Sequence, residues 1–76
     1  MDKERALSAL SVGEGGTVSA LCCEGKIRRR LLDIGLVRGT RVICIGKSPL
    51  GDPKAYLIRG KTVAIRTIDA KSILIN

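Results

Sequence analysis

The chain of 76 residues lacks histidine, tryptophan and phenylalanine, and its single aromatic residue is Tyr56. Histidine is the commonest general base near neutral pH, so a serine or cysteine nucleophile would have only lysine as a basic partner. The seven acidic residues are scattered, and no two have the spacing of a paired-carboxylate site. We therefore predict that the protein is not an enzyme. Because large aromatic rings are missing, we expect a core of Val, Ile, Leu and Ala, as in a small barrel.

Cysteines are few and poorly spaced for metal binding. Cys22 and Cys23 are adjacent, Cys44 lies in a separate apolar run, and no C-x-x-C spacing occurs. Zinc and iron–sulfur sites need characteristic spacings, and adjacent residues of an extended strand point to opposite faces. We predict no metal site and no cofactor. The odd cysteine count argues against a disulfide-stapled secreted domain, so we expect reduced, buried thiols.

Long apolar runs are also missing. None reaches the roughly 18 residues that a membrane-spanning helix needs. Residues 1–5 carry charges of both signs, and no apolar run of signal-peptide length follows them. These features predict a cytoplasmic protein, with a flexible lead over residues 1–6 and one domain over residues 7–76.

Negative charge is scarce as well, because 14 Lys and Arg outnumber 7 Asp and Glu, giving a net charge of +7. Basic residues gather where Lys26, Arg28, Arg29 and Arg30 fall within little more than one helical turn. One interpretation is a solvated helix face, which is how most charge runs behave. The other is a docking surface for an acidic partner, because arginine binds carboxylates with paired hydrogen bonds. Nucleic acid is less favoured, since Tyr56 alone could stack on bases.

The apolar pattern around this cluster predicts one helix over residues 24–34. Ile27, Leu31 and Ile34 recur at helical spacing. Gly35 can end the helix in a left-handed conformation, after which the next leucine packs back on Leu31. Asp33 opposes the helix dipole near the C-terminus, so we expect it to pair with a neighbouring arginine.

The rest of the chain reads as short strands separated by turns. The segment Gly13–Gly16 is glycine-rich and predicts a turn. Ser48–Gly51 has the proline and glycine positions of a type I turn, and Gly60–Lys61 is typical of a type II′ hairpin turn. Residues 68–71 predict a single helical turn. Runs of β-branched and apolar residues predict strands at 17–23, 40–47, 54–59, 62–67 and 72–75.

Five short strands with one inserted helix predict a mainly β fold, a small and partly open barrel. Gly35, Gly39, Gly51 and Gly60 are expected where the backbone needs a positive φ or a close approach. The expected core consists of Val18, Ile27, Leu31, Ile34, Val42, Leu57, Val63 and Ile65.

Seven short segments, in order, resemble the FeoA family. Arg30–Leu36 is similar to its R-L-x-x-[LIM]-G-[LI] helix end, and Ser48–Pro53 to its [AS]-P-L-G-D-P loop. Arg59–Gly60 resembles its R-G hairpin. The remaining similar segments are Leu7–Leu10, Val37–Thr40, Val63–Arg66 and Asp69–Ala70. The Cys22–Cys23 pair is a departure from the family pattern, which leaves open a redox or metal contribution peculiar to this chain.

The resemblance implies an SH3-like barrel without a cofactor that acts as a cytoplasmic accessory to FeoB, the membrane ferrous-iron transporter. It also implies kinship with the C-terminal domain of iron-dependent repressors, so a stand-alone regulatory domain is an alternative. A small nucleic-acid-binding barrel, and an arginine supplied in trans to a GTPase, are further alternatives. Exposed strand edges would permit a homodimer. The expected docking residues are Lys26, Arg28, Arg29, Arg30, Pro49, Leu50, Gly51, Asp52 and Pro53.

Overall fold

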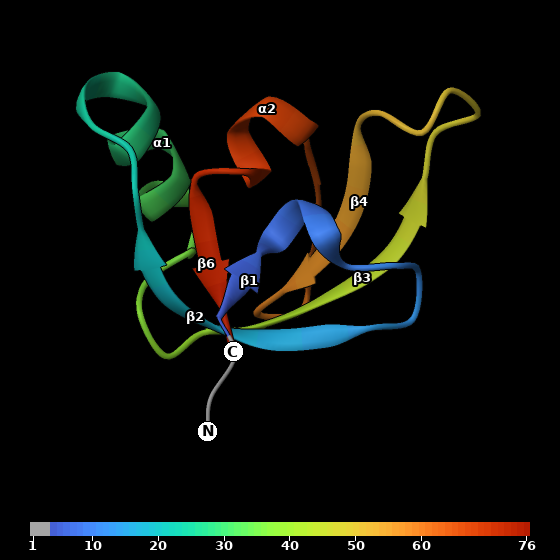
Figure 1. The fold of residues 1–76 in the computed structure, drawn as a ribbon, viewed down its shortest axis with the longest axis horizontal. Helices are drawn as coiled ribbons and strands as arrows, with labels where there is room; N and C mark the ends of the chain where they lie inside the picture. Colours follow the sequence, from blue (N-terminus) through green and yellow to red (C-terminus); the bar gives the residue numbers. More distant parts are fainter. Residues whose placement is uncertain (1–3) are drawn as a thin grey trace.

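The computed structural model describes residues 4–76, and residues 1–3 of the expected flexible lead lie outside this range. The described chain forms one curved antiparallel sheet of six strands in the order β1-β6-β2-β3-β4-β5 (Figure 1). Its elements are β1 (Arg5–Ala6), the 3-10 helix η1 (Leu7–Ala9), β2 (Gly15–Leu21), α1 (Gly25–Ile34), β3 (Arg41–Lys47), β4 (Lys54–Ile58), β5 (Lys61–Ile65), α2 (Thr67–Ala70) and β6 (Ile73–Ile75).

The expected count of five strands is corrected to six. Arg5 and Ala6, which we placed in the flexible lead, form β1 and pair with Ile75 and Leu74 of β6. A two-residue strand is too short to show an alternating pattern. It exists because the end of the chain supplies a partner strand.

Strand β2 connects the two halves of the sheet. Its first three residues pair with β3, and its residues from Val18 onward pair with β6 across a register shift. A Cβ atom on Gly16 would lie 2.8 Å from the Asn76 carbonyl oxygen and 2.8 Å from Ile75 Cδ1. The expected start of this strand at residue 17 was therefore wrong. Gly15 and Gly16 belong to the strand: the lack of a side chain lets β3 approach Gly15 and the end of the chain approach Gly16.

Helix α1 ends as its sequence predicts, although it begins at Gly25 and not at residue 24. The Leu36 N–H donates to the Leu31 carbonyl at 3.1 Å, and the Gly35 N–H donates to the Leu32 carbonyl at 3.0 Å. Gly35 has a φ of 111°. These two bonds with a left-handed residue define a Schellman cap.

The two predicted turns between β3 and β5 have different outcomes. The type I turn is confirmed: the Gly51 N–H donates to the Ser48 carbonyl at 2.8 Å, and Leu50 lacks the positive φ that a type II turn needs. The type II′ turn is wrong: the two central residues are Arg59 and Gly60, with φ values of 52° and 81°. Positive φ at both central positions gives a type I′ turn, whose twist suits a hairpin. Lys61 instead opens β5.

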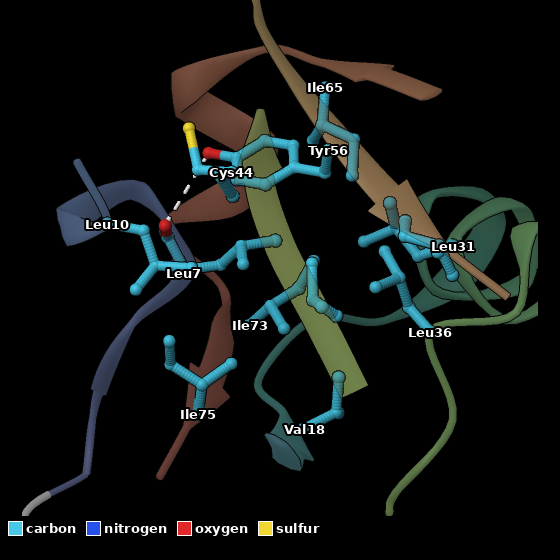
Figure 2. Packing of buried hydrophobic residues seen from close by; sticks show 13 residues of the cluster. Leu7, Leu10, Val18, Leu31, Leu36, Cys44, Tyr56, Ile65, Ile73 and Ile75 are labelled. Atoms are coloured by element: carbon cyan, nitrogen blue, oxygen red, sulfur yellow. Dashed lines mark hydrogen bonds between the residues drawn. The ribbon is translucent and has the colours of Figure 1, made fainter. Parts of the chain in front are cut away.

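The core lies inside the curve of the sheet and is closed by η1, α1 and α2 (Figure 2). Val18, Leu31, Val42 and Ile65 are buried as predicted. Tyr56 takes the inward position of β4, with its hydroxyl 3.5 Å from the Leu7 carbonyl oxygen. Leu36 and Cys44 are also buried, as the helix cap and the expected buried thiols indicated. The core members that the sequence did not indicate are Leu7, Leu10, Tyr56, Ile58, Ala70, Ile73 and Ile75.

The prediction of a buried side chain was wrong for two residues. Ile27 is 49% exposed on α1. Leu57 is only half-buried, because Tyr56 and Ile58 point inward and alternation along a strand puts the residue between them on the opposite face. Ile34 and Val63 are partly buried and pack against the core.

Candidate functional site

The basic face of α1 is one of the two predicted docking regions. Lys26, Arg28, Arg29 and Arg30 are all exposed, as expected for this cluster. The Arg28 guanidinium donates to the Leu21 carbonyl at 3.1 Å, which ties the helix to the end of β2. The other three side chains form no ion pair within residues 4–76 and are exposed to a partner.

The expected pairing of Asp33 with a neighbouring arginine was wrong. Within residues 4–76 the one ion pair joins Arg5 to Glu14, with 3.4 Å between Nη2 and Oε2. Asp33 lines a shallow hollow on α1 together with Lys26 and Arg29 but bonds neither. A carboxylate on an exposed helix gains little from one fixed partner, because water screens the attraction. The helix face therefore stays positive.

The loop between β3 and β4 is the second predicted region. Leu50 at its tip is 94% exposed, and Pro49, Asp52 and Pro53 are also exposed while Gly51 is half-buried. Asp52 has a structural role here: its Oδ1 accepts hydrogen bonds from the Thr67 backbone N–H at 2.8 Å and the Thr67 hydroxyl at 3.1 Å. These bonds fix the loop to the start of α2.

The structure does not bring the two regions together. Figure 1 places α1 and the β3–β4 loop at opposite ends of the longest axis. The principal extents of the molecule are 32 × 29 × 22 Å. A partner that contacts both regions would therefore have to span the long axis of the domain.

A second basic cluster was missed. Arg38, Thr40, Arg41 and Arg59 line one open hollow together with the intervening glycine. The last arginine comes from the β4–β5 turn, and the others lie in or just before β3. The only sequence signal was an arginine in a hairpin turn. Nothing local shows that this turn lies beside the start of β3.

The three cysteines lie in different environments. Cys44 is buried, as expected, whereas Cys22 is exposed and Cys23 is only half-buried. The expectation of three buried thiols was therefore wrong for this pair, because β2 ends at Leu21 and the pair lies in the connection to α1. Residues 4–76 contain no group of three or more side chains of the kinds that could hold a metal ion.

Two titratable groups with shifted pKa values lie outside both docking regions. Burial raises the pKa of Tyr56 to about 12. A hydrogen bond from the Ser11 N–H, and then the nearby Arg5 guanidinium, hold the pKa of Glu14 below its usual value.

None of the helices among residues 4–76 combines the length and apolar character needed to cross a bilayer.

Comparisons with known proteins point to one family. The model of the FeoA domain matches residues 5–76. A Porphyromonas gingivalis protein, described as a fusion of Fe(2+) transport protein A and the Fe(2+) transporter FeoB, is 33% identical over 67 residues. That match covers 88% of this chain but only 8% of the fusion protein.

Solved structures confirm the fold class. A FeoA-like protein from Clostridium acetobutylicum is 37% identical with a TM-score of 0.91, over 100% of this chain and 88% of that one. FeoA from Stenotrophomonas maltophilia, solved with zinc and described as a prokaryotic SH3 domain protein, is 27% identical with a TM-score of 0.82, over 93% and 88%. A manganese-dependent transcriptional repressor shares the fold alone, at 21% identity and a TM-score of 0.86 over 99% of this chain and 42% of that one.

Proposed function

The chain belongs to the FeoA family, and from this premise we propose that it is a non-catalytic cytoplasmic adaptor that docks on the cytosolic part of a FeoB-type transporter. Membership of the family implies a role in ferrous-iron transport. The observation that carries the proposal is the fusion relative, in which a segment similar to this chain is joined to a FeoB transporter in one polypeptide. Covalent fusion keeps two domains at a high effective concentration, which benefits domains that act on each other.

The β3–β4 loop supports docking through its apolar tip. Leu50 is 94% exposed, although an apolar side chain of this size gains free energy when a partner covers it. Ile68 on α2 is 74% exposed, and the two hydrogen bonds that Thr67 donates to Asp52 hold the loop against that helix. The apolar contact surface is therefore partly preorganised, which lowers the entropy cost of binding.

The basic face of α1 supports docking through charge. Arg29 and Arg30 are exposed and unpaired within residues 4–76. Such arginines attract an acidic patch and accelerate encounter more than they add affinity. The loop is expected to supply most of the affinity, and the helix most of the salt dependence.

The proposal is tested by calorimetric titration of the purified chain into the cytosolic part of a FeoB-type transporter. We expect saturable binding at physiological salt, weakened about tenfold or more by Leu50→Asp, which places a charge in an apolar contact. Arg29→Glu with Arg30→Glu should weaken binding mainly at low salt. Lys61→Glu is the control, because it reverses one charge on the β4–β5 hairpin, outside both proposed docking regions. Equal losses for all variants, or no binding by the folded wild type, would contradict docking through these surfaces.

Nucleic acid is the second candidate, favoured by the net charge of +7. Binding of this kind falls steeply as salt rises, because neutralised phosphates release counterions. Duplex and single-stranded DNA are therefore titrated under the same two salt conditions. An affinity for DNA that exceeds the affinity for the transporter at physiological salt would favour nucleic-acid binding as the function.

A further inference from the structure

The second basic cluster is independent of the proposed docking. Its members come together from two places in the chain: Arg38 and Thr40 just before β3, Arg41 at its start, and Arg59 from the β4–β5 turn. They surround an open hollow of about 400 Å³. No acidic side chain lines this hollow, and none of its arginines forms an ion pair within residues 4–76.

Arg59 is held in an unusual backbone conformation beside the hollow. Its φ of 52° makes it the single non-glycine residue with positive φ among those described. Glycine or asparagine would adopt this conformation at lower cost. The side chain lies against the end of α1, with Cδ 3.4 Å and Nε 3.8 Å from the position that a Cβ of Gly35 would occupy. The arginine stem therefore lies within van der Waals range of the C-terminal end of α1.

Thr40 lines the same hollow and carries an unused hydroxyl just below its surface. The residue is 7% exposed, and its Oγ1 is buried without a hydrogen-bond partner within residues 4–76. Its backbone is already occupied, because its N–H donates to the Val37 carbonyl at 3.0 Å and its carbonyl accepts from the Val18 N–H at 2.8 Å. Buried hydroxyls are normally bonded, so this one points to a missing partner.

We propose that the hollow formed by Arg38, Thr40, Arg41 and Arg59 binds a phosphate group of a small ligand. Guanidinium groups bind phosphate through paired, charge-assisted hydrogen bonds. A tetrahedral phosphate has enough oxygens to accept from several arginines and the threonine, whereas a planar carboxylate has only two. Arg41 is the adjustable member: its Nη2 lies 3.5 Å from the Cβ position of Gly15, and its side chain is exposed. Binding requires this side chain to turn towards the anion. Binding removes the repulsion among the three positive charges.

Titration with inorganic phosphate, followed by the NMR signals of the 39–41 amides and the arginine Nε–H groups, tests the proposal. We expect saturable shifts that acetate at equal ionic strength does not produce. Arg59→Gln should weaken phosphate binding at least tenfold, since it removes a charged donor. Lys61→Gln, which removes one charge from the same hairpin outside the hollow, should change it less than twofold.

Thr40→Val distinguishes specific phosphate binding in the hollow from attraction of phosphate to positive charge in general. This change keeps the β-branched shape and removes a buried unbonded hydroxyl, so the fold should be at least as stable, while phosphate binding falls several-fold. Equal effects of Arg59→Gln and Lys61→Gln, or unchanged binding by Thr40→Val, would overturn the proposal. Binding to phosphatidylglycerol vesicles is measured in a separate experiment. Arg59-dependent binding to vesicles without binding to free phosphate would also overturn it, in favour of membrane contact.

Discussion

The Asp52 carboxylate joins the β3–β4 loop to α2, because its Oδ1 accepts hydrogen bonds from both the backbone N–H and the hydroxyl of Thr67, at 2.8 and 3.1 Å. The loop that carries the most exposed apolar residue of the described chain is thereby fixed to a second element. This contact links the stability of the domain to the shape of its proposed docking surface.

Asp52→Ala is expected to lower the free energy of unfolding by about 1–2 kcal/mol, because it removes two hydrogen bonds. Thr67→Val is the matched control: it removes the hydroxyl donor and keeps the backbone N–H, so we expect a loss of about 0.5–1 kcal/mol. Urea denaturation followed by circular dichroism measures both. A larger loss for Thr67→Val than for Asp52→Ala would contradict the assigned role of the carboxylate.

The single tyrosine gives a direct probe of core burial. Burial raises the pKa of Tyr56 to about 12 in the folded protein, whereas an unfolded chain titrates near pH 10. The unfolded state loses this proton first, so the stability contribution is complete below about pH 10 and is lost as the pH rises towards 12.

Tyrosinate absorbance at pH 11 measures this difference. We expect about one tenth of the tyrosine to be ionised in the folded protein and about nine tenths in urea. Equal ionisation in the two states, while circular dichroism still reports a folded protein, would contradict the buried position of the hydroxyl.

A substitution at Gly16 tests how closely β2 packs against the C-terminal residues. A methyl group at this residue would lie 2.8 Å from the Asn76 carbonyl oxygen and from Ile75 Cδ1. Gly16→Ala should therefore cost about 1–3 kcal/mol, as overpacking does. Gly46→Ala in β3 is the control, because its nearest neighbour is 4.0 Å away and its φ is not positive. Thermal unfolding should show a marked loss for the first variant and little change for the second.

Leu31 and Ile27 lie one helical turn apart on α1 but differ in burial, at 2% and 49% exposed. Leu31→Ala should cost about 2–5 kcal/mol, because it leaves a cavity in the core. Ile27→Ala should cost less than about 1 kcal/mol. Equal losses of unfolding free energy in chemical denaturation would show that a different face of α1 packs on the core.

Local chemistry made part of this fold predictable. The cap at Gly35 and the turn ending at Gly51 depend only on residues that are close together in the sequence. The local sequence is therefore sufficient to predict both. The orientation of β4 was not predictable, because Tyr56 and Leu57 are both acceptable inward residues and only the register against β3 and β5 decides between them.

Long-range pairing explains the other misses. Strand β1 exists only through its pairing with β6, across the whole length of the domain. Likewise, Arg59 lies beside Arg38 and Arg41 only because the β4–β5 turn folds next to the start of β3. The exposed arginines of α1 were predictable from their run in the sequence.

The most direct test of the proposed adaptor role is an NMR titration of the isotopically labelled chain with the unlabelled cytosolic part of a FeoB-type transporter at physiological salt. We predict saturable shifts or broadening at residues 49–53 and along the exposed face of α1, while the signals of β5 change little. No change in any signal at concentrations where both proteins remain folded would contradict docking. Changes confined to the Arg38, Arg41 and Arg59 cluster would contradict the proposed contact surface.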